Sequence, residues 1–311
     1  MEKDFPIFIA TGDPAGIGPE ISVKALKYFK DKRTYLIGCF AQLNEFTKRL
    51  NFSEEERKNF LRYSEKIYCK DYPSPENGKL SFEFLKKAVE LAISENGVLI
   101  TAPISKEMWL KAGIDFRGHT EFFEDYFKRD AIMSFFSENF NIALFSHHIP
   151  LKNFWKIFEK ERLKNFFRIL HREVNKRFAL SLTITSSSIN PHAGENGFLG
   201  KEEKEIIIPI IDELKNEGIF IEYPQPNDTI FYKLKGKTDR IIVAYTHDLG
   251  LIPFKLLNFN SGVNITLNIP IVRTSPDHGT AFDIAGKWIA SENSMVEAIK
   301  YAIYLKERDN A

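Results

Sequence analysis

The chain has few of the features that mark several large protein classes. Its two cysteines are too few for a disulfide scaffold or a cysteine-based metal site, and they favour reduced thiols in a cytoplasmic protein. No apolar run approaches the roughly 18 residues that span a bilayer, and the initial Met-Glu-Lys-Asp does not resemble a signal peptide. With 43 basic and 42 acidic residues, the net charge is +1, and the chain lacks the excess of positive charge that is typical of nucleic-acid-binding proteins. We therefore expect a cytoplasmic protein that binds neither nucleic acid nor a membrane.

Familiar catalytic signatures are also missing. The glycine-rich segment 12–18 matches neither the Gly-x-Gly-x-x-Gly dinucleotide motif nor a Walker loop. Neither Gly-x-Ser-x-Gly nor His-Glu-x-x-His occurs. No single motif therefore identifies the reaction.

What is present is an alternation of strand-like and helix-like segments, which predicts an α/β fold with a largely parallel sheet. An apolar strand at 5–10 leads into the glycine-rich loop and then a helix, with Pro19 in the first turn. Such a junction is a usual place to hold an anionic ligand. Further strands are expected at 35–37, 98–101, 142–145, 180–185, 241–245 and 263–267, and helices at 81–95, 153–177, 202–216 and 294–306.

The distribution of motifs suggests two domains. Glycine-rich motifs lie near both ends of the chain, whereas polar motifs cluster between residues 117 and 255. This pattern predicts a terminal domain of residues 1–115 plus 268–311, with a middle domain of residues 116–267 inserted between its halves.

Three histidines follow predicted strands or lie in tight turns: His148, His192 and His247. The carboxyl ends of parallel strands are where α/β sheets bind ligands. Three imidazoles that meet there would bind a divalent metal and leave coordination positions open. Taken singly, each histidine is more often a surface or structural residue, and the adjacent His147 competes with His148.

Other polar groups could bind anions. Gly118-His119-Thr120-Glu121 could offer N–H, imidazole and hydroxyl donors at the start of a helix, although Thr120 could equally be a plain N-cap. Lys255, Asn264 and Arg273 could clamp an anionic substrate, and Lys106 follows a strand in a similar way, although isolated cations usually lie on the surface.

A turn-rich segment, 274–287, contains glycines that permit close approach to a nucleotide. We expect this segment to lead into a helix. The alternative to nucleotide binding is a simple loop-to-helix junction capped by Asp277 or Thr280.

The motifs at 11–20, 118–121, 190–195, 247–250 and 264–286 together resemble the 4-hydroxythreonine-4-phosphate dehydrogenase family, PdxA, in the family's order and over almost the whole chain. The two end motifs also resemble the wider isocitrate and isopropylmalate dehydrogenase group. The resemblance implies two α/β/α domains of that type, a non-Rossmann cofactor site, and a homodimer with its active sites at the subunit interface.

The resemblance also implies roles for individual residues. His148, His192 and His247 correspond to metal ligands, and His148 is preferred over His147 because it directly precedes Ile-Pro-Leu. The implied substrate contacts are His119, Thr120, Lys255, Asn264 and Arg273, and the implied cofactor contacts are Asp277, His278, Gly279 and Thr280. The proton acceptor is not identified, and Asp248 and Lys106 are the candidates.

The implied reaction uses NAD or NADP and one divalent metal, either Zn, Mg or Co. The substrate, 4-phosphohydroxythreonine, is oxidised at C3 to a β-keto acid that decarboxylates to 3-amino-2-oxopropyl phosphate, in pyridoxal phosphate (vitamin B6) biosynthesis.

The sequence departs from the family pattern near the third histidine. Leu249 replaces a usual Gln, and Thr246 replaces a usual Tyr, with Tyr245 one place earlier. These changes keep open a related dehydrogenase of another phosphorylated hydroxy acid. A metal-dependent hydrolase or acyltransferase is a further alternative, because three histidines also suit hydrolysis; saturable NAD binding would separate the two classes.

Overall fold

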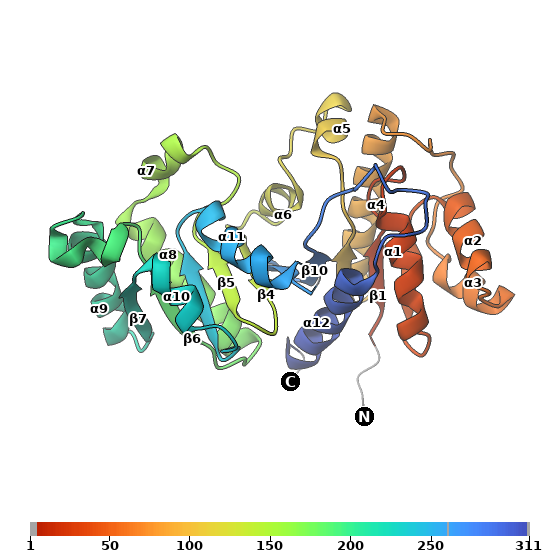
Figure 1. Cartoon of the computed structure of the whole chain (residues 1–311). Coiled ribbons are helices and arrows are strands. Elements are labelled where there is room, and N and C mark those ends of the chain that lie inside the picture. Colours follow the sequence, from red (N-terminus) through yellow and green to blue (C-terminus); the bar gives the residue numbers. More distant parts are fainter. Residues whose placement is uncertain (1–4, 260, 310–311) are drawn as a thin grey trace. The chain divides into compact units, whose positions relative to one another are not determined.

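A computed structural model describes residues 5–259 and 261–309. The chain divides into two compact units: a terminal unit, made of the residues up to Arg129 and those from Ile269 onward, and a middle unit, Asp130–Asn268. Strands and helices alternate in both units (Figure 1), which confirms the predicted α/β fold class.

The terminal unit is built on four parallel strands in the order β2-β1-β3-β10. Their side chains are almost entirely buried, which suits strands covered on both faces. The two segments of the unit meet in this sheet, where Val272 lies opposite Val98. The strands are β1 (Ile7–Ala10), β2 (Thr34–Ile37), β3 (Val98–Thr101) and β10 (Val272–Pro276).

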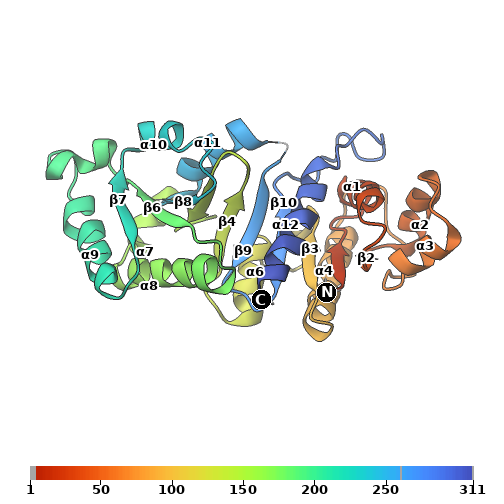
Figure 2. The same ribbon diagram turned by 90° about the horizontal axis from the view of Figure 1, so that it is seen from below.

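Helices cover both faces of this sheet, α1 and α12 on one side and α4 on the other (Figure 2). The helices of this unit are α1 (Gly18–Ala25), α2 (Phe40–Arg49), α3 (Glu54–Phe60), α4 (Pro75–Ser94), α5 (Lys106–Lys111), α6 (His119–Phe127) and α12 (Asn293–Asp309).

Helix α6 packs within the terminal unit, although the sequence analysis placed residues 116–129 in the middle domain. The Phe82 ring on α4 lies 5.2 Å from Trp109, 5.4 Å from Phe122 and 5.9 Å from Phe116, measured between ring centroids. These edge and stacked contacts join α6 to α4 and α5.

Six strands form the sheet of the middle unit, in the order β9-β4-β5-β8-β6-β7. Strand β4 is antiparallel to both of its neighbours, β5 and β9, while β5, β8, β6 and β7 are parallel. The strands are β4 (Ile132–Phe136), β5 (Asn141–Leu144), β6 (Thr183–Ser187), β7 (Ile221–Gln225), β8 (Arg240–Ala244) and β9 (Val263–Leu267).

In this unit α10 and α11 lie on one face of the sheet and α8 on the other (Figure 2). The helices are α7 (Phe154–Ile157), α8 (Lys160–His171), α9 (Ile208–Asn216), α10 (Asn227–Lys233) and α11 (His247–Asn258). The helix expected at 153–177 is interrupted: the ring of Phe158 is buried against Phe145, Phe154 and Tyr245, and its ψ of 73° ends α7.

The expectation that the segment 274–287 runs directly into a helix was wrong. Residues 281–291 form turns and irregular backbone rather than a helix, and α12 begins only at Asn293. A positive φ at Ala281, Gly286 and Trp288 is incompatible with a continuous right-handed helix.

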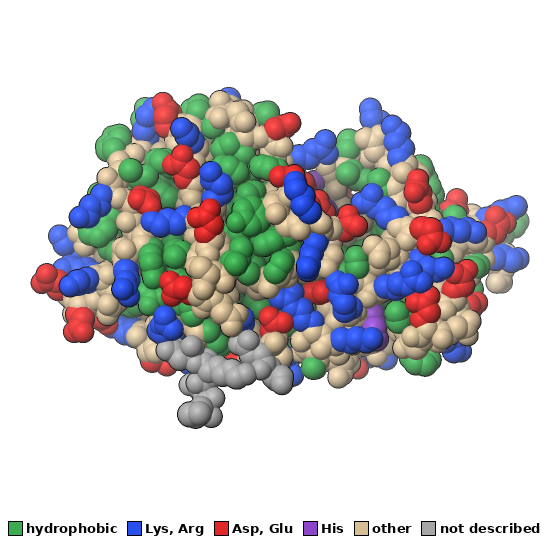
Figure 3. All heavy atoms as spheres, turned by 180° about the vertical axis from the view of Figure 1, so that it is seen from behind, with side chains coloured by type: hydrophobic (Ala, Val, Ile, Leu, Met, Phe, Trp, Pro, Cys, Tyr) green, Lys and Arg blue, Asp and Glu red, His purple; other side chains and the backbone are tan. Residues whose placement is uncertain are grey.

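The described surface is mixed in charge. Basic and acidic side chains are interspersed on the face shown in Figure 3. Among the helices over residues 5–259 and 261–309, none has both the length and the apolarity needed to cross a bilayer.

Candidate active site

The segments carrying the three predicted metal ligands follow three adjacent parallel strands. His148 comes after β5, His247 after β8 and His192 after β6, and the sheet places these strands side by side in the order β5-β8-β6. The middle unit thus brings the carboxyl ends of these strands to one edge, where α/β sheets commonly bind ligands.

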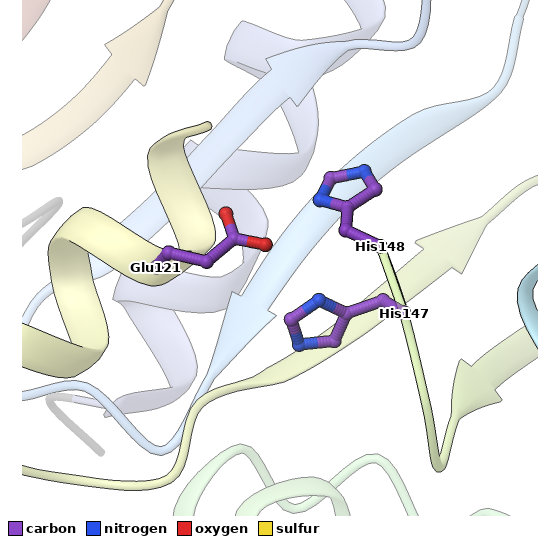
Figure 4. A group of neighbouring side chains, drawn as sticks. All are labelled: Glu121, His147 and His148. Carbon is purple, nitrogen blue, oxygen red and sulfur yellow. The ribbon is translucent and has the colours of Figure 1, made fainter. Parts of the chain in front are cut away.

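Two of these histidines share a cavity of about 290 Å³ in the middle unit. His148 and His247 both line it, with ring centroids 5.7 Å apart, and His147 and Asp248 contribute to the same wall. Figure 4 shows His147 and His148 at successive positions on the loop after β5, and it also draws Glu121 on α6 of the terminal unit. Neighbouring imidazoles on a concave surface are a suitable donor set for Zn²⁺ or a similar divalent ion.

The local backbone orients both rings. His148 has a φ of 39°, an uncommon conformation for a residue with a side chain, and this turns the chain sharply after β5. His247 is the first residue of α11, and its Nδ1 lies 2.7 Å from Asp248 Oδ1. A carboxylate at one ring nitrogen fixes the imidazole and leaves Nε2 available to bind a cation.

His192 lies in a different environment. The five residues from His192 to Asn196 have φ values between 42° and 76°, so the chain makes a left-handed turn. His192 is exposed, and it does not line the cavity of His148 and His247. Over the described residues, His192 belongs to no group of three metal-binding side chains whose ligand atoms lie within 4.8 Å of one another. The three-histidine metal site stays a prediction.

The backbone just before this turn is hydrogen-bonded to a buried carboxylate, Glu203, which was not identified from the sequence. Glu203 is 2% exposed, and its Oε1 accepts the N–H groups of Ile189 and Asn190, each at 2.7 Å. Its Oε2 accepts the Asn190 side-chain amide at 2.8 Å. A Cβ at Gly194 would approach Glu203 Oε2 to 2.8 Å, so this glycine permits the close contact as well as the positive φ.

The two unusual residues beside His247 lie in different places: Thr246 lines the cavity, whereas Leu249 does not. Leu249 packs against the apolar cluster that contains Leu251 and Phe254, and it is not among the residues that line the cavity. Tyr245 is fully buried, with its hydroxyl 2.8 Å from Ser186 Oγ, and burial raises its pKa. The replacement of Gln by Leu therefore changes the packing beneath α11 rather than the cavity wall.

The terminal unit gathers a second group of predicted residues around Arg273. The guanidinium of this buried residue donates from Nε and Nη2 to Thr101 Oγ1, at 3.1 and 2.5 Å, and lies 5.4 Å from the centroid of the Phe123 ring. Its burial lowers its pKa to about 9. Because the site remains basic at neutral pH, it suits an anionic group.

His119 lies close to this guanidinium. Its ring packs against Trp109 and Phe123, with centroids 5.8 and 6.5 Å apart. Although part of the side chain reaches solvent, desolvation lowers its pKa well below 6.5, and the charges of Arg273 and Lys106 lower it further. His119 is therefore neutral near pH 7, and its ring can donate one hydrogen bond and accept another.

Thr120 is buried at the second position of α6, and Gly118 is the N-cap, so the alternative in which Thr120 caps the helix is wrong.

The other two predicted substrate contacts belong to the middle unit. Lys255 is partly exposed on α11, and Asn264 lies in β9 opposite Phe135 of β4.

The opening glycine loop and the C-terminal loop of the terminal unit are in contact. The Ile17 N–H donates to the Thr280 carbonyl at 2.9 Å, and a Cβ at Gly16 would come within 2.9 Å of the same oxygen. Asp277, His278 and Thr280 are partly buried, whereas Gly279 is exposed. A cavity of about 360 Å³ opens beside this junction, lined by residues that include Gly16, Gln42 and Gly286.

Comparison with known proteins agrees with the resemblance. The sequence model of the family described as "Pyridoxal phosphate biosynthetic protein PdxA" matches residues 25–302. The chain belongs to this family. A curated relative from Aquifex aeolicus, named 4-hydroxythreonine-4-phosphate dehydrogenase, is 40% identical, and the match covers 94% of this chain and 96% of the relative. A relative from Salmonella typhimurium, named D-threonate 4-phosphate dehydrogenase, is 36% identical, with 96% and 98% covered.

Solved structures give the same result. A 4-hydroxythreonine-4-phosphate dehydrogenase from Klebsiella pneumoniae matches with a TM-score of 0.81 at 30% identity, over 97% of this chain and 100% of that one. A terephthalate 1,2-cis-dihydrodiol dehydrogenase from Burkholderia xenovorans, at 20% identity, has a TM-score of 0.66 over 97% and 98% of the two chains. The second likeness shows a common fold alone.

Proposed function

We propose that the protein catalyses the NAD(P)-dependent and divalent-metal-dependent oxidation of 4-phosphohydroxythreonine at C3. The resulting β-keto acid decarboxylates to 3-amino-2-oxopropyl phosphate, in pyridoxal phosphate biosynthesis. The observation that carries the proposal is the cavity of His148 and His247, at the carboxyl ends of adjacent parallel strands. It lies in a chain 40% identical to a relative named for this activity.

His148 and His247 would hold the metal from one chain. When bound, a divalent metal supplies Lewis acidity, which lowers the pKa of a substrate hydroxyl. The two rings are pre-oriented for this task, one by the turn at His148 and the other by the Asp248 carboxylate. Zn, Mg and Co all remain consistent with the proposal, although imidazole nitrogens suit Zn and Co better than Mg.

We further propose a homodimer with the active site at its interface, in which His192 completes the metal site of a second copy. Its exposure and its separation from the cavity within one chain support this arrangement. Large apolar side chains are exposed shortly after each of the three histidines, which is typical of a surface that another protein covers. They are Leu151 at 73%, Phe198 at 85%, Ile252 at 68% and Leu256 at 82% exposed.

The substrate's anionic groups require cations. Arg273, fixed by Thr101, is proposed as one contact, with neutral His119 and the Thr120 hydroxyl as neighbouring donors. Lys255 and Asn264 are the proposed contacts from the middle unit. Asp248 and Lys106 are the two candidates for the group that accepts the substrate's hydroxyl proton.

The dinucleotide is proposed to bind in the terminal unit at Asp277, His278, Gly279 and Thr280. The contact between Thr280 and Ile17 and the cavity beside it support this assignment. Bound NAD(P) supplies the hydride acceptor. The protein's part is to fix the cofactor with its backbone and to exclude water.

An absorbance assay for NADH or NADPH formation tests the proposal. The purified protein should reduce the cofactor when 4-phosphohydroxythreonine is added, and a chelator should abolish the signal. His192→Ala should lose turnover and metal while the circular dichroism spectrum is retained. Full activity and metal content in that variant would eliminate the three-histidine site.

A related reaction on D-threonate 4-phosphate is the second candidate, because a relative 36% identical over nearly the whole chain carries that name. Parallel measurements of kcat/KM with the two phosphorylated substrates separate the candidates. A preference for D-threonate 4-phosphate would replace the proposed substrate and leave the reaction type unchanged.

A further inference from the structure

The only two cysteines of the chain both lie in the terminal unit, and neither is assigned a role in the proposed reaction. Cys39 and Cys69 are both free thiols, and both line the cavity of about 360 Å³. The Cys39 side chain contacts the backbone of Ile67, two residues before Cys69, which places the two thiols close together at this cavity. Two thiols that are thirty residues apart in sequence therefore face one solvent-accessible space.

Backbone pairing holds the segment of Cys39 in place. Cys39 directly follows the loop residue Gly38 after β2 and forms a parallel bridge with Glu65. The Phe40 N–H donates to the Glu65 carbonyl and the Glu65 N–H to the Gly38 carbonyl, both at 2.8 Å. The Cys39 thiol also lies 3.1 Å from the Ile67 carbonyl. Hydrogen bonds therefore join residues 38–40 to Glu65 and Ile67, beside the pair.

Their proximity makes the two thiols chemically unequal. Interaction with the Cys69 side chain stabilises the Cys39 thiolate and lowers the pKa of Cys39, while the same interaction and burial raise the pKa of Cys69. The thiolate is the reactive form of cysteine, and a reactive thiol beside a second one is the arrangement that forms disulfides. Cys39 is only 2% exposed, so a reagent must reach it through the cavity.

We infer that Cys39 and Cys69 form an oxidation site at which a small peroxide converts the pair into an intramolecular disulfide. The Cys39 thiolate attacks one oxygen of hydrogen peroxide. The O–O bond breaks, and the leaving hydroxide takes up a proton to become water. The Cys69 sulfur then attacks the Cys39 sulfenic acid, and the second oxygen leaves as water. Overall, two thiols and one peroxide give one disulfide and two waters. The cavity volume is several times the roughly 30 Å³ occupied by a water molecule, so a peroxide fits.

The disulfide would alter a cavity wall to which Gly16, Ala285 and Gly286 also contribute. These residues come from the opening loop and the C-terminal loop, which are in contact through Ile17 and Thr280. Oxidation would thus fix the 65–69 segment against the end of β2, next to the junction of the two loops. The same cavity supports the proposed dinucleotide site, but the inference rests on the two thiols alone and does not require that proposal.

The test is a peroxide titration of the folded full-length protein, followed by alkylation and peptide mass spectrometry. We expect a single product that has lost two hydrogen atoms, in which the peptides of Cys39 and Cys69 are linked, and dithiothreitol should restore both free thiols. If both thiols remain open to alkylation after peroxide treatment, the inference is wrong. Independent oxidation of each cysteine to sulfinic acid without a link would overturn it equally.

Matched single variants assign the order of events. Cys69→Ser should form a sulfenic acid at Cys39 that a dimedone-type probe traps, because no second thiol is present to resolve it. Cys39→Ser should react with peroxide at least tenfold more slowly than the wild type. Equal rates in the two variants would contradict the assignment of Cys39 as the attacking thiol. Circular dichroism of each variant verifies that it is folded.

Discussion

Removal of the Glu203 carboxylate should release the turn that carries His192. Within this turn, four residues other than glycine have a positive φ, and each costs about 1–2 kcal/mol relative to a right-handed conformation. The free energy needed to hold the turn is therefore roughly 4–8 kcal/mol. The three hydrogen bonds that Glu203 accepts from Ile189 and Asn190 are the interactions that offset this cost where the turn begins.

The size of the effect follows from those bonds. A hydrogen bond to a charged group contributes about 1.5–3 kcal/mol. The turn is partly exposed, so water replaces some of the lost bonds, and Glu203→Ala should lower the free energy of unfolding by about 3–5 kcal/mol. Glu203→Gln keeps one oxygen for the two backbone N–H groups, and the expected loss is about 1–2 kcal/mol.

Urea denaturation followed by circular dichroism measures these losses, and limited proteolysis reports local opening of residues 190–200. Glu202→Gln is the matched control. Glu202 also accepts the Asn190 amide, at 2.7 Å, but it is only partly buried, so its loss should be below about 1 kcal/mol. The reasoning is refuted if Glu203→Ala costs no more than Glu202→Gln, or if the turn in Glu203→Ala resists proteolysis as well as the wild type.

Three further changes test other parts of the structure. Folding lowers the pKa of His119 below 6.5, so the unfolded chain takes up a proton below that pH. The free energy of unfolding should therefore fall from pH 7 to pH 5, by up to about 1.4 kcal/mol per pH unit. In His119→Gln, the urea midpoint of unfolding should depend less on pH. Lys24→Met breaks a buried ion pair with Glu20 at 2.7 Å and the bonds to the Trp288 and Ala290 carbonyls. It should lower the urea-unfolding free energy by about 3–5 kcal/mol, and a loss near zero would contradict the role of the pair. Leu256→Glu, at a side chain 82% exposed, should halve the mass measured by light scattering if copies pair through this face; an unchanged mass would exclude α11 from the contact.

The sequence predicted those elements whose pattern follows from local preference. The apolar runs at 98–101 and 263–267 coincide with β3 and β9, and α4 contains nearly all of the helix expected at 81–95. Strands β4, β7 and β10 were missed. Strands β7 and β10 each contain a proline and polar residues, and only their pairing with a neighbouring strand identifies them as strands. The interruption at Phe158 was equally invisible, since it depends on aromatic rings that come from distant segments.

The site was predicted through resemblance more than through physical chemistry. Strand ends correctly suggested where His148 and His247 would lie, and the structure places both on one cavity. The role of Glu203 was hidden, because in the sequence it is one of several acidic residues at the start of an expected helix. The glycines at 194, 197 and 200 were a usable signal for the turn, but not for the carboxylate that binds the N–H groups of Ile189 and Asn190.

The discontinuous terminal unit has a consequence for synthesis of the protein on the ribosome. Strand β3 pairs with β1 on one side and with β10 on the other. Between them the ribosome must make the whole of Asp130–Asn268, which is 139 residues and takes roughly 7–30 s at about 5–20 residues per second. The middle unit is continuous and can fold during that interval, whereas β3, with the sequence Val-Leu-Ile-Thr, waits as an open edge. Nascent chains halted just before β10 should therefore bind chaperones more strongly than chains released after α12.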